Sequence, residues 1–243
     1  MDKAVLRPDQ ELREIVHHLK NLITIDREMG LEAPKLSAST IAYMDKGPSE
    51  GQSLEGLKKF IGECTRCKLS DKRTHLVFGE GSEKARLVFV GEGPGREEDL
   101  AGRPFVGEAG ELLTKIIENG MNLRREDVYI CYIIKCHPPG NRDPESDEID
   151  ACLPFLKKQL ALIQPEVICT LGQIAAQSLL GRDFKMTRER GRWQSFEEIS
   201  VMPTFHPAYI LRNPDREREL KGLVWKDIKK IMKRMGLEVK RND

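Results

Sequence analysis

Residues 86–99 read RLVFVGEGPGREED, a short apolar run that ends directly in a glycine-rich, acidic loop. Similar apolar, β-branched or aromatic runs, typical of buried strands, lie at 127–135, 166–172 and 198–205. Stretches with a helical pattern separate or follow them, at 108–118, 146–163, 172–180 and about 214–235. Strands that alternate with helices indicate an α/β fold, with a mostly parallel central sheet covered by helices on both faces.

In such sheets, ligands bind at the carboxyl ends of the strands. That rule selects four segments of this chain, each of which ends or follows one of the apolar runs. They are GEGPGREED, IKCHPP, TLGQ and FHPAY. The sequence therefore predicts that these four segments form one site.

Length and composition describe a globular protein. The chain has 243 residues, 39% hydrophobic and 33% charged, enough for one large domain with or without an appendage. These values exclude collagen-like and fully disordered classes. No apolar run approaches the roughly 20 residues of a membrane helix, and the N-terminus lacks the apolar core of a signal peptide. We therefore expect a cytoplasmic protein, and its net charge of +1 identifies no partner.

The chain divides into three predicted parts. Residues 8–29 carry apolar side chains at helical spacing and end before Gly30, which predicts an amphipathic helical appendage over 1–33. Residues 34–53 are rich in turn formers and predict a linker, and 54–243 form the main domain. The appendage either packs on the domain or binds a protein partner, and we expect a monomer.

The six cysteines stand at positions 64, 67, 131, 136, 152 and 169. Disulfides are not expected inside the cell. Cys64 and Cys67 form a CxxC at the end of a short helix, Cys136 ends the second apolar run, and Cys152 follows 16 positions later on a helix. Four such thiolates can bind zinc or an iron–sulfur cluster, and the split second half favours [4Fe–4S]. The other two cysteines sit inside apolar strands and are expected to be buried and inert.

The loop segments allow more than one interpretation. GEGPG lacks the GxGxxG spacing of a dinucleotide site, and Pro94 removes a phosphate-facing N–H, so a nucleotide cradle is not expected. Phe105, held between Pro104 and Gly107, either packs in the core or stacks on a planar ligand. His206 either donates to a developing anion or caps a helix locally.

Taken together, these segments resemble the family 4 uracil-DNA glycosylases, the iron–sulfur type. The matching pieces run from about Ser53 to the C-terminal helix, and the first 52 residues lie outside the resemblance. They are ECTRC, GEGPGREEDLAGRPFVGEAGELL, VYICYIIKCHPPGNRDP, the Cys152 helix, TRERGRW and MPTFHPAYILRNP.

The resemblance implies a three-layer α/β/α fold around a mostly parallel four-stranded sheet. It also implies a [4Fe–4S] cluster on the four cysteines that the spacing selects, Cys64, Cys67, Cys136 and Cys152. The implied activity is base excision repair: the enzyme flips uracil out of DNA and hydrolyses its N-glycosidic bond. We therefore expect uracil-containing DNA as the partner, in the nucleoid region of a prokaryotic cytoplasm.

The same resemblance implies roles for individual residues. Phe105 stacks on the extruded uracil and His206 faces uracil O2, where it stabilises the departing anion. The other pocket residues are Gly91, Glu92, Gly93 and Glu98. The loop that enters the DNA carries Tyr209, Leu211 and Arg212. The sequence leaves open whether Glu92, Glu98 or mainly electrostatics activates water, because family 1 enzymes have an Asp where this chain has Gly93.

One position departs from the family pattern. Family 4 members usually carry Asn near the end of the second strand, and Tyr132 stands here. An Asn amide donates and accepts at once, whereas a Tyr hydroxyl makes fewer simultaneous pairs, so we expect Tyr132 to alter base or strand preference. If Tyr132 points away, backbone groups read the base. The alternatives to an active enzyme are a catalytically weak module that binds DNA or a repair partner, and an electron-transfer protein.

Overall fold

The computed structural model describes residues 53–181 and 183–238. The predicted N-terminal helix and nearly all of the predicted linker lie outside the described residues. Within the described residues, no helix is both long and apolar enough to span a membrane.

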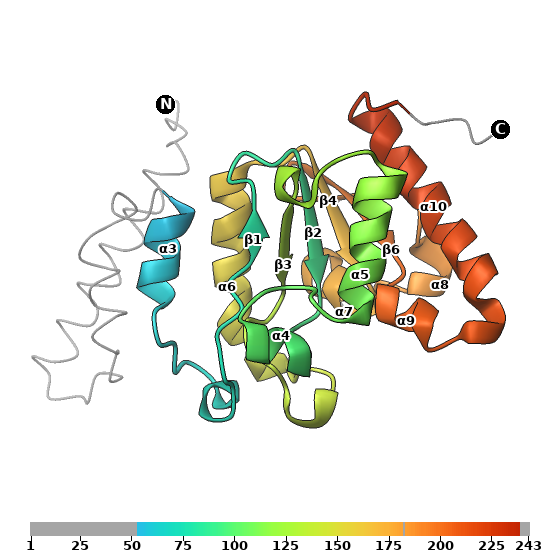
Figure 1. The fold of residues 1–243 in the computed structure, drawn as a ribbon. Coiled ribbons are helices and arrows are strands. Elements are labelled where there is room, and N and C mark those ends of the chain that lie inside the picture. The colour runs from blue at the N-terminus through green and yellow to red at the C-terminus, as the bar shows by residue number, and fades with distance from the viewer. Residues whose placement is uncertain (1–52, 182, 239–243) are drawn as a thin grey trace, which may run out of the picture. The chain divides into compact units, whose positions relative to one another are not determined.

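A single sheet runs through the centre of the domain (Figure 1). Its strands are β1 (Glu80–Gly81), β2 (Leu87–Gly91), β3 (Tyr129–Tyr132), β4 (Val167–Leu171), β5 (Gln194–Phe196) and β6 (Ile199–Thr204). Their spatial order is β1-β3-β2-β4-β6-β5. The four central strands are parallel, and β1 and β5 pair antiparallel at the two edges. The expectation of four strands therefore holds for the parallel centre, and two short edge strands make six.

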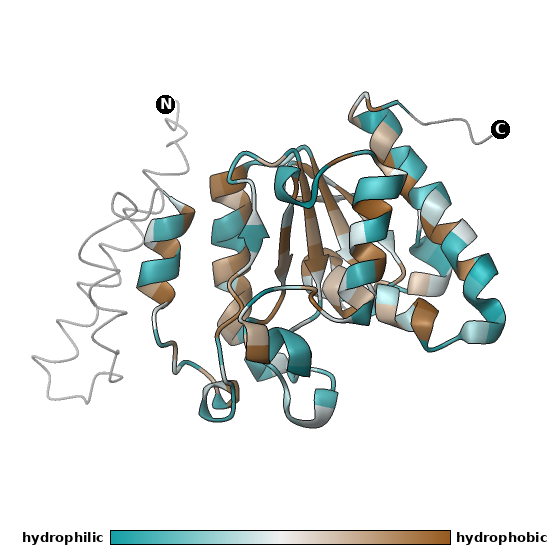
Figure 2. Cartoon of the chain, viewed as in Figure 1, coloured by the Kyte–Doolittle hydropathy of each residue, from teal (hydrophilic) through white to brown (hydrophobic). Residues whose placement is uncertain are grey.

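Helices cover both faces of the sheet. Along β2, Val88 and Val90 face one apolar cluster, whereas Leu87 and Phe89 face the other. The first cluster is completed by α3 (Leu54–Ile61), α6 (Ser146–Ile163) and α7 (Gln173–Leu180). The second is completed by α5 (Glu108–Lys115), a π-helical turn η3 (Ile116–Gly120), α9 (Pro207–Leu211) and α10 (Glu217–Arg234). Figure 2 shows the apolar strands enclosed between helices with polar outer surfaces. The predicted three-layer α/β/α fold is confirmed.

Short elements at the strand ends complete the fold. They are α4 (Arg96–Ala101), α8 (Met186–Glu189) and the 3-10 turns η2 (Lys68–Asp71), η4 (Arg125–Asp127), η5 (Pro139–Asn141) and η6 (Pro214–Arg216). The predicted helix 146–163 matches α6, while the predicted strand 127–135 is shorter in the structure. After Tyr132 the chain leaves the ladder, although Ile133 N–H still donates to Gly91 O at 2.9 Å.

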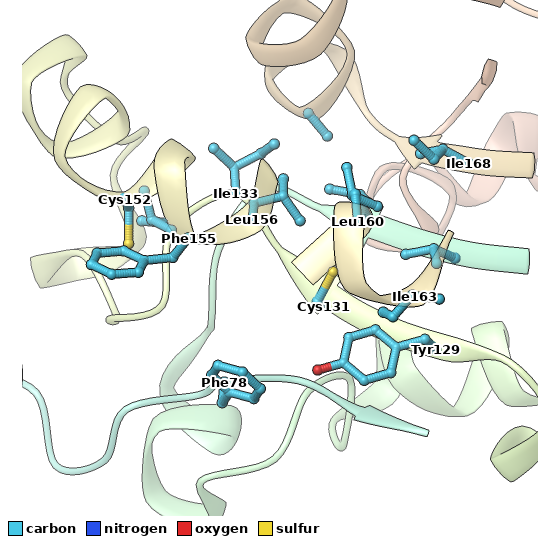
Figure 3. Packing of buried hydrophobic residues seen from close by; sticks show 14 of the residues in the cluster. Phe78, Tyr129, Cys131, Ile133, Cys152, Phe155, Leu156, Leu160, Ile163 and Ile168 are labelled. Carbon is cyan, nitrogen blue, oxygen red and sulfur yellow. The ribbon is translucent and has the colours of Figure 1, made fainter. Parts of the chain in front are cut away.

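Two cysteines lie in the strands, as predicted. Cys131 and Cys169 are 1% and 0% exposed, and Cys131 packs near Tyr129 and Leu160 in the first cluster (Figure 3). Burial raises the pKa of the Cys131 thiol to about 11 and that of Cys169 well above its usual value. Both thiols are therefore protonated at neutral pH and serve as packing groups.

Candidate active site

A cleft of about 590 Å³ opens at the carboxyl edge of the parallel strands. Its walls come from the loops after β2, β3, β4 and β6, within residues 92–95, 138–143, 172–177 and 205–212. All four predicted segments therefore contribute to one cleft, as the strand-end rule requires. Helix α8 adds Met186 and Thr187; Thr187 begins the TRERGRW stretch, but no site role was predicted for either residue.

His206 lines the cleft at the N-terminal end of α9. Its Nδ1 accepts a hydrogen bond from the Ala208 N–H at 3.1 Å. Burial, together with the nearby charge of Arg212, lowers the pKa of His206 to about 4, so the ring is neutral at physiological pH. Because Nδ1 is an acceptor, the proton of the neutral ring is on Nε2. His206 thus offers one neutral N–H donor.

Glu92 lines the same cleft, half-buried. Burial and, to a smaller extent, the charge of Asp143 raise its pKa to about 7, against the opposing charge of Arg212. A carboxylate with a pKa near the working pH is suited to accept a proton from water. Glu92 is therefore the carboxylate of the predicted set that the geometry favours as a base.

The predicted DNA-entering loop lies at this cleft. Tyr209 and Arg212 line it, and Tyr209 stacks on Phe205 with ring centroids 5.3 Å apart. Leu211 does not line the cleft, but its side chain is 37% exposed. An exposed apolar side chain beside a cleft is suited to enter the base stack of DNA.

The TRERGRW stretch contacts both the segment after β6 and helix α10. Arg190 lies over the ring of Phe205, 5.2 Å from its centroid, and forms an ion pair with the buried Asp227. Asp227 also accepts a hydrogen bond from Thr204 Oγ1 at 2.7 Å. The end of β6, from which His206 follows, is therefore anchored to α10.

Glu98 occupies a different place from Glu92. It is 8% exposed and does not line the cleft. Its Oε2 accepts from Gly95 N–H at 3.0 Å, and its Oε1 accepts from the N–H groups of Val106 and Gly107 at 3.0 and 3.3 Å. These contacts tie the loop after β2 to the loop that carries Phe105. They favour a positioning role for Glu98 over a catalytic one.

Replacing Glu98 by alanine should lower the free energy of unfolding by about 3 kcal/mol, because three backbone N–H groups lose their acceptor. Denaturant unfolding measures this change. Glu97→Ala is the matched control, because Glu97 is exposed on the same turn of α4. Equal midpoints for the two variants would contradict the assignment.

Phe105 and Tyr132 do not line the cleft. Their side chains are buried, 3% and 2% exposed. The two rings stack with centroids 4.9 Å apart, and Phe105 also stacks on His206 at 5.5 Å. In this conformation the Phe105 ring stacks on two other aromatic rings and does not face the cleft.

The two predicted pocket glycines allow close backbone approach. A Cβ on Gly93 would lie 2.6 Å from Ile134 Cγ1, and a Cβ on Gly91 would lie 2.8 Å from Phe105 Cζ. Either contact is shorter than real Cβ atoms allow. Gly93 lines the cleft, whereas Gly91 lies behind it against the two aromatic rings.

Three polar residues of the cleft, Asn141, Arg142 and Asp143, were not predicted from the sequence. Asn141 Oδ1 lies 2.7 Å from His137 Nε2, and Arg142 forms a bidentate pair with Glu148 at 2.5 and 2.8 Å. Their signal in the sequence was the polar turn NRDP, which follows the CHPPG segment after the second predicted strand.

The four predicted metal ligands gather in one corner of the domain. Cys136 and Cys152 belong to the first apolar cluster, and Cys64 and Cys67 pack against it. Arg73 Nη1 joins two of them, because it donates to Cys64 O at 2.5 Å and to Cys136 Sγ at 3.5 Å. Burial apart, Cys64 and Cys67 also lie near enough to Cys136 to raise its pKa, and Cys136 and Cys67 do the same to Cys152, so the structure brings the CxxC, the segment after β3 and α6 together.

Cationic groups surround these thiols. Arg66 donates to Cys64 Sγ at 3.3 Å, and the buried Lys135 donates to Tyr132 O at 2.7 Å beside Cys136. In the part of the chain that the structure describes, no three His, Cys, Asp or Glu side chains lie close enough to hold one metal ion. A cluster with several irons binds each thiolate through a different iron and so needs wider spacing. The donor set and its cations fit an anionic thiolate cluster.

Comparison with known proteins gives a consistent result. A family model described as the uracil DNA glycosylase superfamily matches residues 78–229. A type-4 uracil-DNA glycosylase of Sulfurisphaera tokodaii is 46% identical over 187 residues, which are 74% of this chain and 83% of that protein. Those of Thermotoga maritima and Archaeoglobus fulgidus are 46% and 43% identical, over 73% and 74% of this chain and 92% of each relative. The likeness therefore covers a whole domain rather than a short motif.

Proposed function

This chain belongs to the uracil-DNA glycosylase superfamily, and on that premise we propose that its cleft takes up uracil flipped out of DNA and hydrolyses the N-glycosidic bond, leaving an abasic site. The activity is that of a monofunctional uracil-DNA glycosylase in DNA repair. The observation that carries the proposal is the meeting of Glu92 and His206 in one cleft, beside the exposed loop of α9.

The reaction develops charge in two places. The bond breaks toward a cation-like sugar and a uracil anion, so the site needs a donor for the anion and a base for the attacking water. His206 supplies the donor through Nε2–H at uracil O2. Because the ring is neutral, His206 stabilises the anion by a hydrogen bond from Nε2–H and does not transfer this proton to it.

Glu92 supplies the base. As the carboxylate it accepts a proton from the water that attacks the sugar, and its negative charge also favours the cation-like sugar. Tyr209, Leu211 and Arg212 contact the DNA, and Leu211 enters the space that the base vacates.

The four cysteines hold a [4Fe–4S] cluster in this proposal. The support is the corner they share, their thiolate chemistry and the cations beside them. A bound cluster would link α6, the segment after β3 and the CxxC loop. The hydrolysis described above uses other residues.

Replacing Cys136 by serine should remove the iron and the brown colour of the purified protein. Cys131→Ser is the matched control, since Cys131 is also a buried thiol, five positions earlier within β3, and is not one of the four proposed ligands. Iron analysis should find about four irons per chain in the wild type and the control. Equal iron content in Cys136→Ser and Cys131→Ser would contradict the ligand assignment.

Base release by the purified chain tests the function itself. The substrates are oligonucleotides with uracil opposite G, opposite A and unpaired, together with hypoxanthine and xanthine. We expect release of uracil, leaving alkali-sensitive abasic sites. DNA binding without release of any base would instead support a binding module.

A further inference from the structure

Three aromatic rings form a continuous stack from the sheet to the cleft. Tyr132 stacks on Phe105 at 4.9 Å with the planes 24° apart, and Phe105 stacks on His206 at 5.5 Å with the planes 27° apart. Of the three, His206 alone lines the cleft. A flat base that is to stack on Phe105 must therefore take the place of one of its neighbours.

Tyr132 is held in this stack by two further contacts. The Phe105 N–H donates to the Tyr132 hydroxyl oxygen at 2.9 Å. Both rings also rest against the backbone of Gly91, where a Cβ would approach Phe105 Cζ at 2.8 Å and Tyr132 Cδ1 at 2.9 Å. The missing side chain of Gly91 thus creates the space that the two rings fill.

The backbone of Phe105 adopts an unusual conformation within this stack. Phe105 has a φ of +50°, a conformation that bulky residues rarely adopt. The loop is fixed on both sides of it: Arg125 donates to Pro104 O at 2.6 Å, and Glu98 accepts from Val106 N–H at 3.0 Å. Phe105 is therefore held in place through its backbone neighbours, and a base that stacks on the face of Phe105 that Tyr132 covers has to displace the Tyr132 ring.

Resting on the function proposed above, we propose that Tyr132 closes the base pocket: its ring occupies a face of Phe105 and must swing away before a flipped base can stack there. Tyr132 is then a specificity-determining residue. A base that binds there has to break the stack of Tyr132 on Phe105 and the buried hydrogen bond between them. The free energy of base binding is therefore less favourable than in a pocket with a small residue at this position.

Fluorine NMR on the full chain labelled with 3-fluorotyrosine tests this directly. The chain has four tyrosines, and Tyr→Phe variants assign the resonances of Tyr129, Tyr132 and Tyr209. The probe is an oligonucleotide with 2′-fluoro-2′-deoxyuridine, which resists cleavage, compared with a thymidine oligonucleotide. Tyr209, exposed at the cleft, should respond to both. Tyr132 should respond to the uracil probe alone, and the buried Tyr129 to neither.

Substitution gives a second measurement. Tyr132→Asn should raise the affinity for free uracil, measured by inhibition or direct binding, on the order of tenfold, because the stack and its hydrogen bond no longer compete. Tyr132→Phe retains the ring and should stay closer to the wild type. Tyr129→Phe is the matched control, because Tyr129 lies on the same strand and faces the other cluster.

The outcomes separate this proposal from the proposed function. A Tyr132 resonance that stays in place while the wild type releases uracil would overturn the closure and leave the function standing. Uracil release by Tyr132→Asn alone would support the closure and overturn the function of the unaltered chain. Unchanged uracil affinity in a folded Tyr132→Asn would also overturn the closure.

Discussion

Uracil release should slow about 100- to 1,000-fold when His206 is replaced by alanine, with DNA affinity retained. The reason is the neutral ring: its Nε2–H is the donor for the anion that forms on uracil, and among the described residues no other histidine lines the cleft. Because the donor acts on charge that develops during bond breaking, its loss affects the chemical step rather than DNA binding.

Single-turnover release measures the chemical step, and a binding titration on a non-cleavable oligonucleotide measures the affinity. His75→Ala is the control, since the Nδ1 of His75 also bonds to backbone, at Asp99 O, but His75 does not line the cleft. Equal loss of affinity and rate in His206→Ala would assign His206 to DNA binding instead.

Glu92→Gln should slow release by about 100- to 10,000-fold, because the amide cannot accept a proton from water. The substitution preserves the size of the side chain, so the fold and DNA affinity should be unchanged. Glu97→Gln provides the control, because Glu97 is an exposed carboxylate on the neighbouring helix. If Glu92→Gln stayed within tenfold of the wild type, electrostatics rather than base catalysis would dominate the site.

The sequence predicted the edge of the sheet at which the cleft opens, for a physical reason. The apolar runs that become β2 and β4 are buried on both faces, so their pattern is strong and their carboxyl ends are readable. The loops after β2, β3, β4 and β6 then had to meet at one edge. The four candidate ligand cysteines could be chosen from the sequence for a similar reason, because they lie on or next to predicted strand and helix ends.

The remaining features depend on side-chain packing, which spacing does not encode. Glu92 and Glu98 are both acidic and six positions apart, yet one lines the cleft and the other bonds to backbone N–H groups. The sequence showed that Tyr132 stands where family 4 members usually carry Asn, but it did not predict the stack of this ring on Phe105. Strands β1 and β5 have two and three residues, too few for a periodic pattern.

The most direct test of the account is the pH dependence of single-turnover uracil release, measured from about pH 5 to about pH 9 in the wild type and Glu92→Gln. Because the pKa of Glu92 is raised to about 7, the base is lost below that pH. The wild-type rate should therefore fall about tenfold per pH unit below about 7 and level off above it, and the Glu92→Gln rate should be flat. The same inflection in both proteins, or a flat wild-type profile, would contradict the central role of this carboxylate.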